Sequence, residues 1–247
     1  MLVYKLEPDV QQHKKSNMPQ ILSIAVCISD EVTLSDFVPA VEILAHLNLA
    51  DHPIYGAAIG EVPYRVTIDY VAPTMEPVVA LLGRVAPTVN PTLTYADALA
   101  SGKQFDVLLV PAGPMDYVTG EKKTPQAEID FIAKQAPKAK YVMSVCGGAY
   151  QFALAGILSG KRATTNKALY RAIVAATPKD IEWVAKARWV VDGNIWTSSG
   201  VSAGADMALA FVEHLTDAKV ARFVRGGIEI PEATDQDDPF AAFHGLV

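Results

Sequence analysis

The sequence predicts one α/β domain in which helices cover both faces of a largely parallel sheet, a three-layer α/β/α sandwich. Three observations lead to this prediction. Short continuous apolar runs, such as residues 21–28, are typical of strands that are buried on both faces. Segments with helical spacing of apolar residues alternate with these runs, as they do in parallel sheets. At Cys146 an apolar run changes into a helix with only two glycines at the join.

The expected elements follow one another along the chain with short connections. Strands are expected at 21–28, 64–73, 105–113 and 140–145, and helices at 40–50, 124–136, 147–158, 202–215 and 216–229. Thr124 and Pro125 form a typical helix opening, with the threonine as cap. The segment 188–200 predicts a hairpin, because Asp192, Gly193 and Asn194 supply a turn.

The chain of 247 residues is long enough for one large domain, with no repeat and no clear internal boundary. We expect a flexible N-terminal extension at 1–20, a single domain at 21–230 and a docked C-terminal tail at 231–247. The tail is acidic and rich in turn residues, and Phe240 and Phe243 are the expected docking side chains.

Composition excludes several classes of function. Hydrophobic residues make up 51% of the chain and the net charge is −6, so we expect no nucleic-acid partner. No run of eighteen apolar residues and no secretory signal pattern occurs, so we expect no membrane association and a cytoplasmic location. The two cysteines and five histidines show no metal-ligand spacing, so we expect neither a metal nor a cofactor.

Cys146 is the candidate nucleophile. A strand-to-helix elbow exposes its side chain, places the sulfur at the amino end of a helix and favours the thiolate. Gly147 leaves a backbone N–H to hold negative charge, and Gly148 permits close approach. A buried packing role is the alternative for Cys146, and it is the expected role of Cys27, which lies inside a strand.

Two segments, "SVCGGAYQFALAGILSGKRATTNK" and "WTSSGVSAGADMALAFVEHL", resemble the ThiJ/PfpI superfamily, and the resemblance extends over about residues 21–230. It implies the class I glutamine amidotransferase-like fold, with a flavodoxin-like, largely parallel sheet and a nucleophile elbow. Within the superfamily the chain is most similar to the isonitrile hydratase-like branch and to the enzymatic domain of some AraC-type regulators. The sequence contains no helix-turn-helix segment, so we expect no regulator.

The segment "TLSDFVPAVEIL" is similar to a family segment that carries an acidic residue beside the cysteine. The resemblance implies that Asp36 is a catalytic proton donor whose pKa the thiolate would raise. The alternative is that Asp36 caps the following helix. Pro39 and Ala40 replace the family's Gly-Pro, so the local chain path is expected to differ. Glu42 matches a family glutamate, for which we expect a structural hydrogen bond or ion pair near the site.

The chain departs from the family at two further positions. Gly147 replaces the threonine that follows the cysteine in isonitrile hydratases, and a PfpI-type histidine is absent there, which disfavours peptidase activity. Asn166 replaces a family histidine, and an amide cannot carry a proton at neutral pH. A cysteine–histidine dyad is therefore missing, unless His46, His52 or His214 folds into the site.

The remaining candidates hold the substrate or its developing charge. Gly147 and Gly113 are the expected backbone donors, although the turn at Gly113 has ending a strand as its alternative role. Asn166, Thr165 and Ala112 are candidate substrate-binding residues. Thr164 and Thr165 are candidates for the pocket wall or for a helix start.

Three functions follow. The first is a cysteine-dependent hydratase or hydrolase of a small molecule, most similar to isonitrile hydratase, which converts an isonitrile to an N-substituted formamide. Its enzyme class would be lyase or hydrolase. The second is a cofactor-free glyoxalase or carbonyl-damage enzyme, disfavoured by the missing histidine. The third is a non-enzymatic redox-sensing stress protein with an oxidisable cysteine. The resemblance also implies a homodimer.

Overall fold

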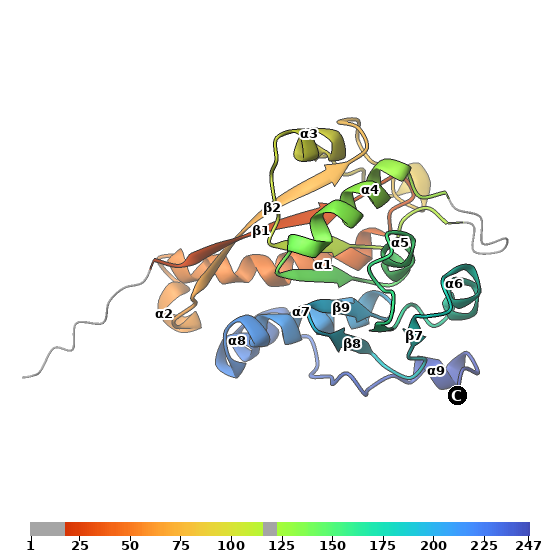
Figure 1. Cartoon of the computed structure of the whole chain (residues 1–247). Coiled ribbons are helices and arrows are strands. Elements are labelled where there is room, and N and C mark those ends of the chain that lie inside the picture. Colours follow the sequence, from red (N-terminus) through yellow and green to blue (C-terminus); the bar gives the residue numbers. More distant parts are fainter. Residues whose placement is uncertain (1–17, 116–122) are drawn as a thin grey trace, which may run out of the picture.

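The computed structural model describes residues 18–115 and 123–247 and contains a central sheet of seven strands (Figure 1). The strand order is β3-β2-β1-β4-β5-β9-β8, and all neighbours are parallel except β8 and β9. The strands are β1 (Gln20–Cys27), β2 (Tyr64–Ala72), β3 (Leu93–Thr94), β4 (Val107–Val110), β5 (Tyr141–Ser144), β8 (Trp189–Asp192) and β9 (Ile195–Ser198). A two-stranded sheet pairs β6 (Arg162–Ala163) with β7 (Glu182–Trp183). The largely parallel sheet and the hairpin are as the sequence predicts.

Helices cover both faces of the sheet, as the three-layer prediction requires (Figure 1). One face carries α1 (Leu34–Ala45), α7 (Val201–Leu215) and α8 (Ala218–Ile228), and the other carries α3 (Tyr95–Ala100), α4 (Gln126–Gln135) and α5 (Gly148–Leu154). Shorter elements are α2 (Gly56–Ile59), α6 (Tyr170–Ala176), α9 (Phe240–Phe243) and the 3₁₀ helices His46–Asp51, Gly83–Val85 and Ala136–Lys138.

The two cores meet in β1, whose side chains point alternately to opposite faces of the sheet. Ile24 and Val26 pack with α1 and α7, whereas Ala25 and Cys27 pack with α3 and α4. Both faces are therefore buried, which explains why the strand reads as a continuous apolar run. Cys27 is 1% exposed and has the packing environment that the sequence suggests.

Several boundaries differ from the expected ones, including those of the strand expected at 105–113, which is Val107–Val110. The helix expected at 40–50 begins at Leu34, so Pro39 and Ala40 lie inside α1 rather than in a loop. The helix after the elbow ends at Leu154. Thr124 does not cap α4, because its hydroxyl donates to the Pro114 carbonyl at 3.1 Å.

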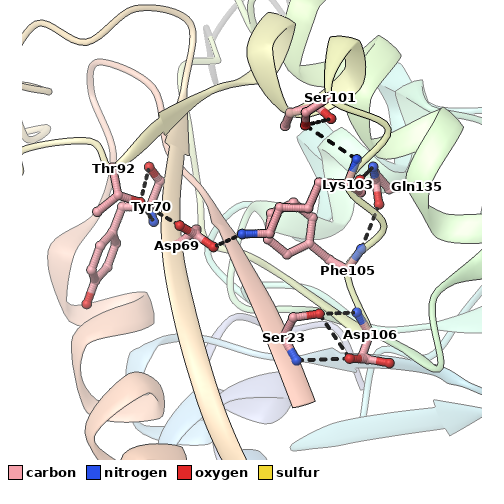
Figure 2. A network of polar contacts seen from close by, with 10 residues as sticks. Ser23, Asp69, Tyr70, Thr92, Ser101, Lys103, Phe105, Asp106 and Gln135 are labelled. Atoms are coloured by element: carbon pink, nitrogen blue, oxygen red, sulfur yellow. Dashed lines mark hydrogen bonds and ion pairs between the residues drawn. The ribbon is translucent and has the colours of Figure 1, made fainter. Parts of the chain in front are cut away.

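A polar network fixes the amino end of β4, at the edge opposite Cys146 (Figure 2). Asp106 accepts hydrogen bonds of 2.9 Å from both the backbone N–H and the hydroxyl of Ser23 in β1. Gln135 at the end of α4 accepts from the Phe105 N–H at 3.0 Å and donates to the Lys103 carbonyl at 2.8 Å. These bonds replace ladder contacts where the strand begins, so β4 enters the sheet in a defined register.

The C-terminal tail, residues 229–247, returns to α6 and to the segment before β8 (Figure 1). The expected anchors are wrong: Phe240 and Phe243 are 48% and 79% exposed. The tail is held instead by Asp238, whose carboxylate lies 3.4 Å from the Lys167 ammonium, with both side chains 1% exposed. Arg171 of α6 adds hydrogen bonds to the last carbonyls. A buried ion pair, not aromatic packing, docks the tail.

Glu128 of α4 is a second buried acid, and it joins four elements. Ser29, which follows β1, donates a hydrogen bond to it, and Tyr95 of α3 and Gln151 of α5 also interact with its carboxyl group. Burial raises the pKa of Glu128 to about 7, against the lowering effect of these partners. The folded state is therefore more stable when Glu128 is protonated than when it is ionised.

We predict that Asp238→Ala destabilises the protein by about 3 kcal/mol, because it leaves the Lys167 ammonium buried without its carboxylate. The double variant Lys167→Met, Asp238→Leu should recover most of that loss, since it removes both charges together. Urea denaturation of the three variants measures the effect. A free energy of unfolding for Asp238→Ala equal to that of the parent would contradict the role of the ion pair.

We predict that Glu128→Gln changes the pH dependence of stability. From its ordinary pKa of 4.5 to about 7, folded Glu128 keeps a proton that the unfolded chain has lost, so stability falls as pH rises through this window. The variant has no group that titrates here, so the difference between its free energy of unfolding and that of the parent should grow by about 3 kcal/mol from pH 4.5 to pH 7.5. Urea denaturation across this range measures it, with Glu213→Gln on exposed α7 surface as the control. Parallel pH profiles for Glu128→Gln and the parent would refute the prediction.

Candidate active site

Cys146 lies between β5 and α5 with φ of 60°, in the left-handed region that non-glycine residues rarely adopt. Such a conformation costs about 1–3 kcal/mol and persists only when its surroundings enforce it. Two backbone bonds do so here: the Cys146 N–H donates to the Ser199 carbonyl at 2.8 Å, and the Val145 N–H donates to the Val110 carbonyl at 3.0 Å. The chain therefore turns sharply at the cysteine, as the sequence predicts.

Gly148 permits this turn because the first residue of α5 passes directly over β4. A Cβ atom at this position would stand 2.0 Å from the Val110 carbonyl oxygen, a distance that no side chain tolerates. The second glycine after Cys146 is thus a steric requirement of the elbow. It brings the sulfur to the carboxyl edge of β4 and β5, where parallel sheets bind their ligands.

Asp36 lies in the first turn of α1, but its side chain does not cap that helix. The residue is 1% exposed, and Oδ2 accepts a hydrogen bond of 3.1 Å from the Ala112 N–H. Oδ1 is buried and lacks a hydrogen-bond partner of ordinary geometry, and the carboxyl group lies close enough to the Cys146 thiol to interact with it. The structure therefore brings the predicted acid and the predicted nucleophile together.

Burial controls the protonation of this pair. It raises the pKa of Asp36 to about 7, although the bonds from Ala112 and Cys146 act in the opposite direction. Burial and the nearby Asp36 charge also raise the pKa of Cys146 well above its ordinary value, against the lowering effect of the Gly147 N–H and Asn166. The elbow predicts a stabilised thiolate, but Cys146 is only 7% exposed, and loss of hydration outweighs the donors. At neutral pH the cysteine is therefore a thiol, and it lies beside a carboxyl group whose pKa is close to the surrounding pH.

Asn166 holds a fixed orientation over the sulfur. Its Nδ2 donates to the Cys146 Sγ at 3.3 Å, and its Oδ1 accepts from the N–H groups of Ala168 and Leu169 at 2.9 and 3.3 Å. Because these backbone donors fix Oδ1, the NH₂ group must face the cysteine. The residue supplies a hydrogen-bond donor where the family histidine would stand, but no proton.

Thr165 supports the elbow and Thr164 supports the segment before β8, and neither lines the cavity beside the elbow or starts a helix. The Thr165 hydroxyl donates to the Cys146 carbonyl at 2.7 Å, and the Thr164 hydroxyl donates to the Val184 carbonyl at 2.8 Å. Both residues are fully buried. Thr165, a predicted substrate-binding residue, is therefore a contact to the nucleophile's own backbone.

The turn after β4 faces the site from the other side. The N–H of Ala112 is engaged by Asp36, so Ala112 positions the acid instead of the substrate. Gln151 of α5 donates to the Pro111 carbonyl at 3.1 Å, and a Cβ on Gly113 would stand 2.7 Å from its Nε2. The Gly147 N–H points to the Cys146 sulfur. The predicted backbone donors thus border the elbow, with Gly147 next to the thiol.

Glu42 and the three candidate histidines lie away from Cys146. Glu42 is exposed on α1, and its backbone carbonyl contacts His46. His52 packs beside Tyr55, and His214 packs among Tyr141, Trp196 and Phe211. In the described part of the chain, the polar contacts of the sulfur therefore include no histidine.

A cavity of about 280 Å³ lies beside the elbow. Asn166 links the two, because the side chain that donates to the sulfur also lines the cavity. The opposite wall is formed by tail residues, including Asp238, Phe240 and His244. Apart from the acidic run before Phe240, no local pattern predicts these tail residues, since only the folded chain brings Asp238 to Lys167.

No helix in the described residues has the length and apolar character needed to cross a membrane. The same residues contain no cluster of three or more histidine, cysteine, aspartate or glutamate side chains arranged to hold a metal ion.

Comparison with known proteins identifies the family of this chain. The DJ-1/PfpI family model matches residues 22–214. An isonitrile hydratase of Pseudomonas putida is 35% identical over 151 residues, which are 60% of this chain and 60% of that protein. A deglycase of Pyrococcus abyssi is 31% identical over 123 residues, which are 49% of this chain and 67% of that protein.

Among solved structures, a ThiJ/PfpI family protein from Pseudomonas syringae superposes with a TM-score of 0.68 at 23% identity. The match covers 95% of this chain and 86% of that protein, and it shows the shared fold. The family match spans the sheet from β1 through the elbow and nearly to the end of α7. The chain belongs to the DJ-1/PfpI family.

Proposed function

We propose that the protein is a cysteine-dependent hydratase of small isonitriles, with Cys146 as nucleophile and Asp36 as the group that moves the proton. The buried contact between these two side chains carries the proposal, because it places one transferable proton beside one nucleophilic sulfur. The similarity to an isonitrile hydratase over 151 residues supports the substrate class. That match spans about 60% of the relative's length, so an isonitrile as the substrate of this chain is part of the proposal.

The first step adds the thiol across the isonitrile carbon. Asp36 as carboxylate takes the Cys146 proton, the sulfur attacks the terminal carbon, and Asp36 returns the proton to that carbon, giving a thioimidate. The Gly147 N–H and the Asn166 amide stabilise the sulfur while it carries negative charge. One S–C bond and one C–H bond form, and the proton count is unchanged.

The second step releases the product. Water adds across the C=N bond of the thioimidate, its oxygen to carbon and one of its protons to nitrogen. The C–S bond then breaks as the carbonyl forms, and the second water proton goes to the sulfur, which leaves an N-substituted formamide and free Cys146. The sum is one isonitrile and one water giving one formamide. Asp36 carries the proton between the sulfur and the substrate carbon, so the proposed steps do not require a histidine.

A carbonyl-damage activity is the second candidate, and the similarity to a deglycase over 123 residues favours it. Rearrangement of a hemithioacetal moves a proton between adjacent carbons, which Asn166 does not assist. Production of lactate from methylglyoxal by the parent, without formamide from any isonitrile, would select this reaction.

Oxidation of Cys146 by two oxygens under mild peroxide, with neither product formed, would select the redox-sensing role. We also propose a homodimer, which light scattering on the purified protein tests.

We predict that Cys146→Ser abolishes formamide formation and that Asp36→Asn lowers kcat/KM at least about 100-fold, since it removes the proton carrier. Benzyl isocyanide is the substrate, and the formamide is measured by liquid chromatography with mass detection. Cys27→Ala is the control, because this thiol lies in the core away from the elbow. Activity in Asp36→Asn equal to that of the parent would exclude the proposed mechanism.

The pH profile gives an independent prediction. Below the Asp36 pKa of about 7 both groups are protonated and the carboxylate base is missing, so kcat/KM should rise with pH up to that value and then level off. The Cys146 pKa lies far above its ordinary value, so a second limb is not expected below pH 9. Initial rates in a constant-ionic-strength buffer series measure the profile. A rate that is flat from pH 5 to pH 8 would show that Asp36 does not carry the proton.

A further inference from the structure

The cavity beside the elbow has the size of a small-molecule site. Its volume is about 280 Å³, close to the lower end of the about 300–1,000 Å³ that is typical of ligand pockets. Four segments that are distant in sequence form it: the loop after β6, Arg188 before β8, the start of α7 with the residues that precede it, and the tail. Asn166 belongs to the first and also contacts the sulfur of Cys146.

The charges around this cavity are already paired. The Lys167 ammonium lies 3.4 Å from Asp238 and also donates to Thr164 at 2.6 Å and to the Ala187 carbonyl at 2.8 Å. The Arg188 guanidinium lies 2.5 Å from Asp206. A charged ligand would have to break one of these pairs, whereas a neutral ligand leaves them intact.

The apolar part of the lining comes from both sides of the cavity, from Val201 and Ala203 at the start of α7 and from Phe240 in the tail. Phe240 is the largest of these side chains and is half-exposed. Such a mixture of apolar walls and a few fixed polar groups is typical of sites for small organic ligands.

We propose that the C-terminal tail forms the selective wall of the substrate site, with Phe240 as the side chain that limits the size of the apolar substituent on a neutral substrate. The proposal rests on the proposed function for the identity of the substrate. The position of the wall, in the cavity that Asn166 also lines, does not depend on that identity.

The tail is anchored at both ends of α9, which fixes Phe240 in place. Asp238 accepts a hydrogen bond of 2.9 Å from the Phe240 N–H, and the same carboxylate pairs with Lys167. At the other end, Arg171 donates to the carbonyls of His244 and Gly245 at 3.0 and 2.6 Å. These bonds hold the backbone of α9 at both ends, so the wall that carries Phe240 does not yield freely to a larger ligand.

Phe243 is a matched control on the same short helix. It is 79% exposed and does not line the cavity. A substitution there changes an aromatic residue of the tail without changing the wall.

The experiment measures size selection with two independent readouts. In the full-length protein, Phe240→Ala, Phe240→Leu, Phe240→Trp and Phe243→Ala are compared for kcat/KM with methyl and benzyl isocyanide. The same variants are compared for the rate of Cys146 alkylation by iodoacetamide and by its larger N-phenyl derivative, read by peptide mass. Cys27, 1% exposed, is the internal control for opening of the core, and thermal melting confirms that each variant is folded.

We expect Phe240→Ala to raise the large-to-small ratio about threefold or more and Phe240→Trp to lower it by a similar factor, because a change of a few methylene volumes has effects of this order. Phe240→Leu should fall between Phe240→Ala and the parent, and Phe243→Ala should match the parent. Ratios that stay constant across folded Phe240 variants would overturn the proposal, even if the parent hydrates isonitriles. If the parent hydrates no isonitrile but the alkylation ratio follows the size of residue 240, the wall is supported and the proposed function fails.

Discussion

The buried contact between Asp36 and Cys146 is the interaction on which the site depends. It joins α1 to the elbow between β5 and α5, two segments that are separated by more than a hundred residues. Neither group is solvated well enough to ionise easily, and the Asp36 pKa of about 7 expresses this cost. The cost is kept because the Ala112 N–H holds the carboxyl group in place and the backbone bonds of the elbow hold the sulfur. Burial of Asp36 and Cys146 thus lowers the stability of the fold at the position where the proposed proton transfer takes place.

The fold was predictable because its signals are local. Each parallel strand is buried on both faces and therefore reads as an apolar run, and the hairpin has its turn residues at Gly193, where φ is 63°. The elbow was also predictable, because the two glycines after Cys146 are a local signal. The structure explains the second one, since a side chain at Gly148 would collide with β4. The pairing of Asp36 with Cys146 came from resemblance to a family and not from the residues alone.

The errors have a common physical cause, which is that a polar side chain near a helix end has several possible partners. Thr124 was expected to cap α4 but donates to Pro114, and Thr165 was expected to face the substrate but donates to the Cys146 carbonyl. The local sequence identifies a side chain that can donate a hydrogen bond, but it does not identify the group that accepts it. The tail shows the same effect for charges: Asp238 finds Lys167 across the fold, whereas the apolar Phe243 remains exposed.

Asn166 restricts the chemistry that this site performs. A histidine at the same position could take a proton from one atom and deliver it to the next, and this would permit rearrangement between adjacent carbons. The amide cannot do so, and its orientation is locked by two backbone donors. The site therefore holds one mobile proton, shared by Cys146 and Asp36, and one fixed donor to the sulfur. Hydration of an isonitrile is compatible with this arrangement, because the proton that leaves the thiol is delivered to the carbon that the thiol attacks, and the nitrogen takes its proton from the water that enters in the second step. A rearrangement that moves a proton between adjacent carbons would need a second proton-transfer group, which the described site does not place beside the sulfur.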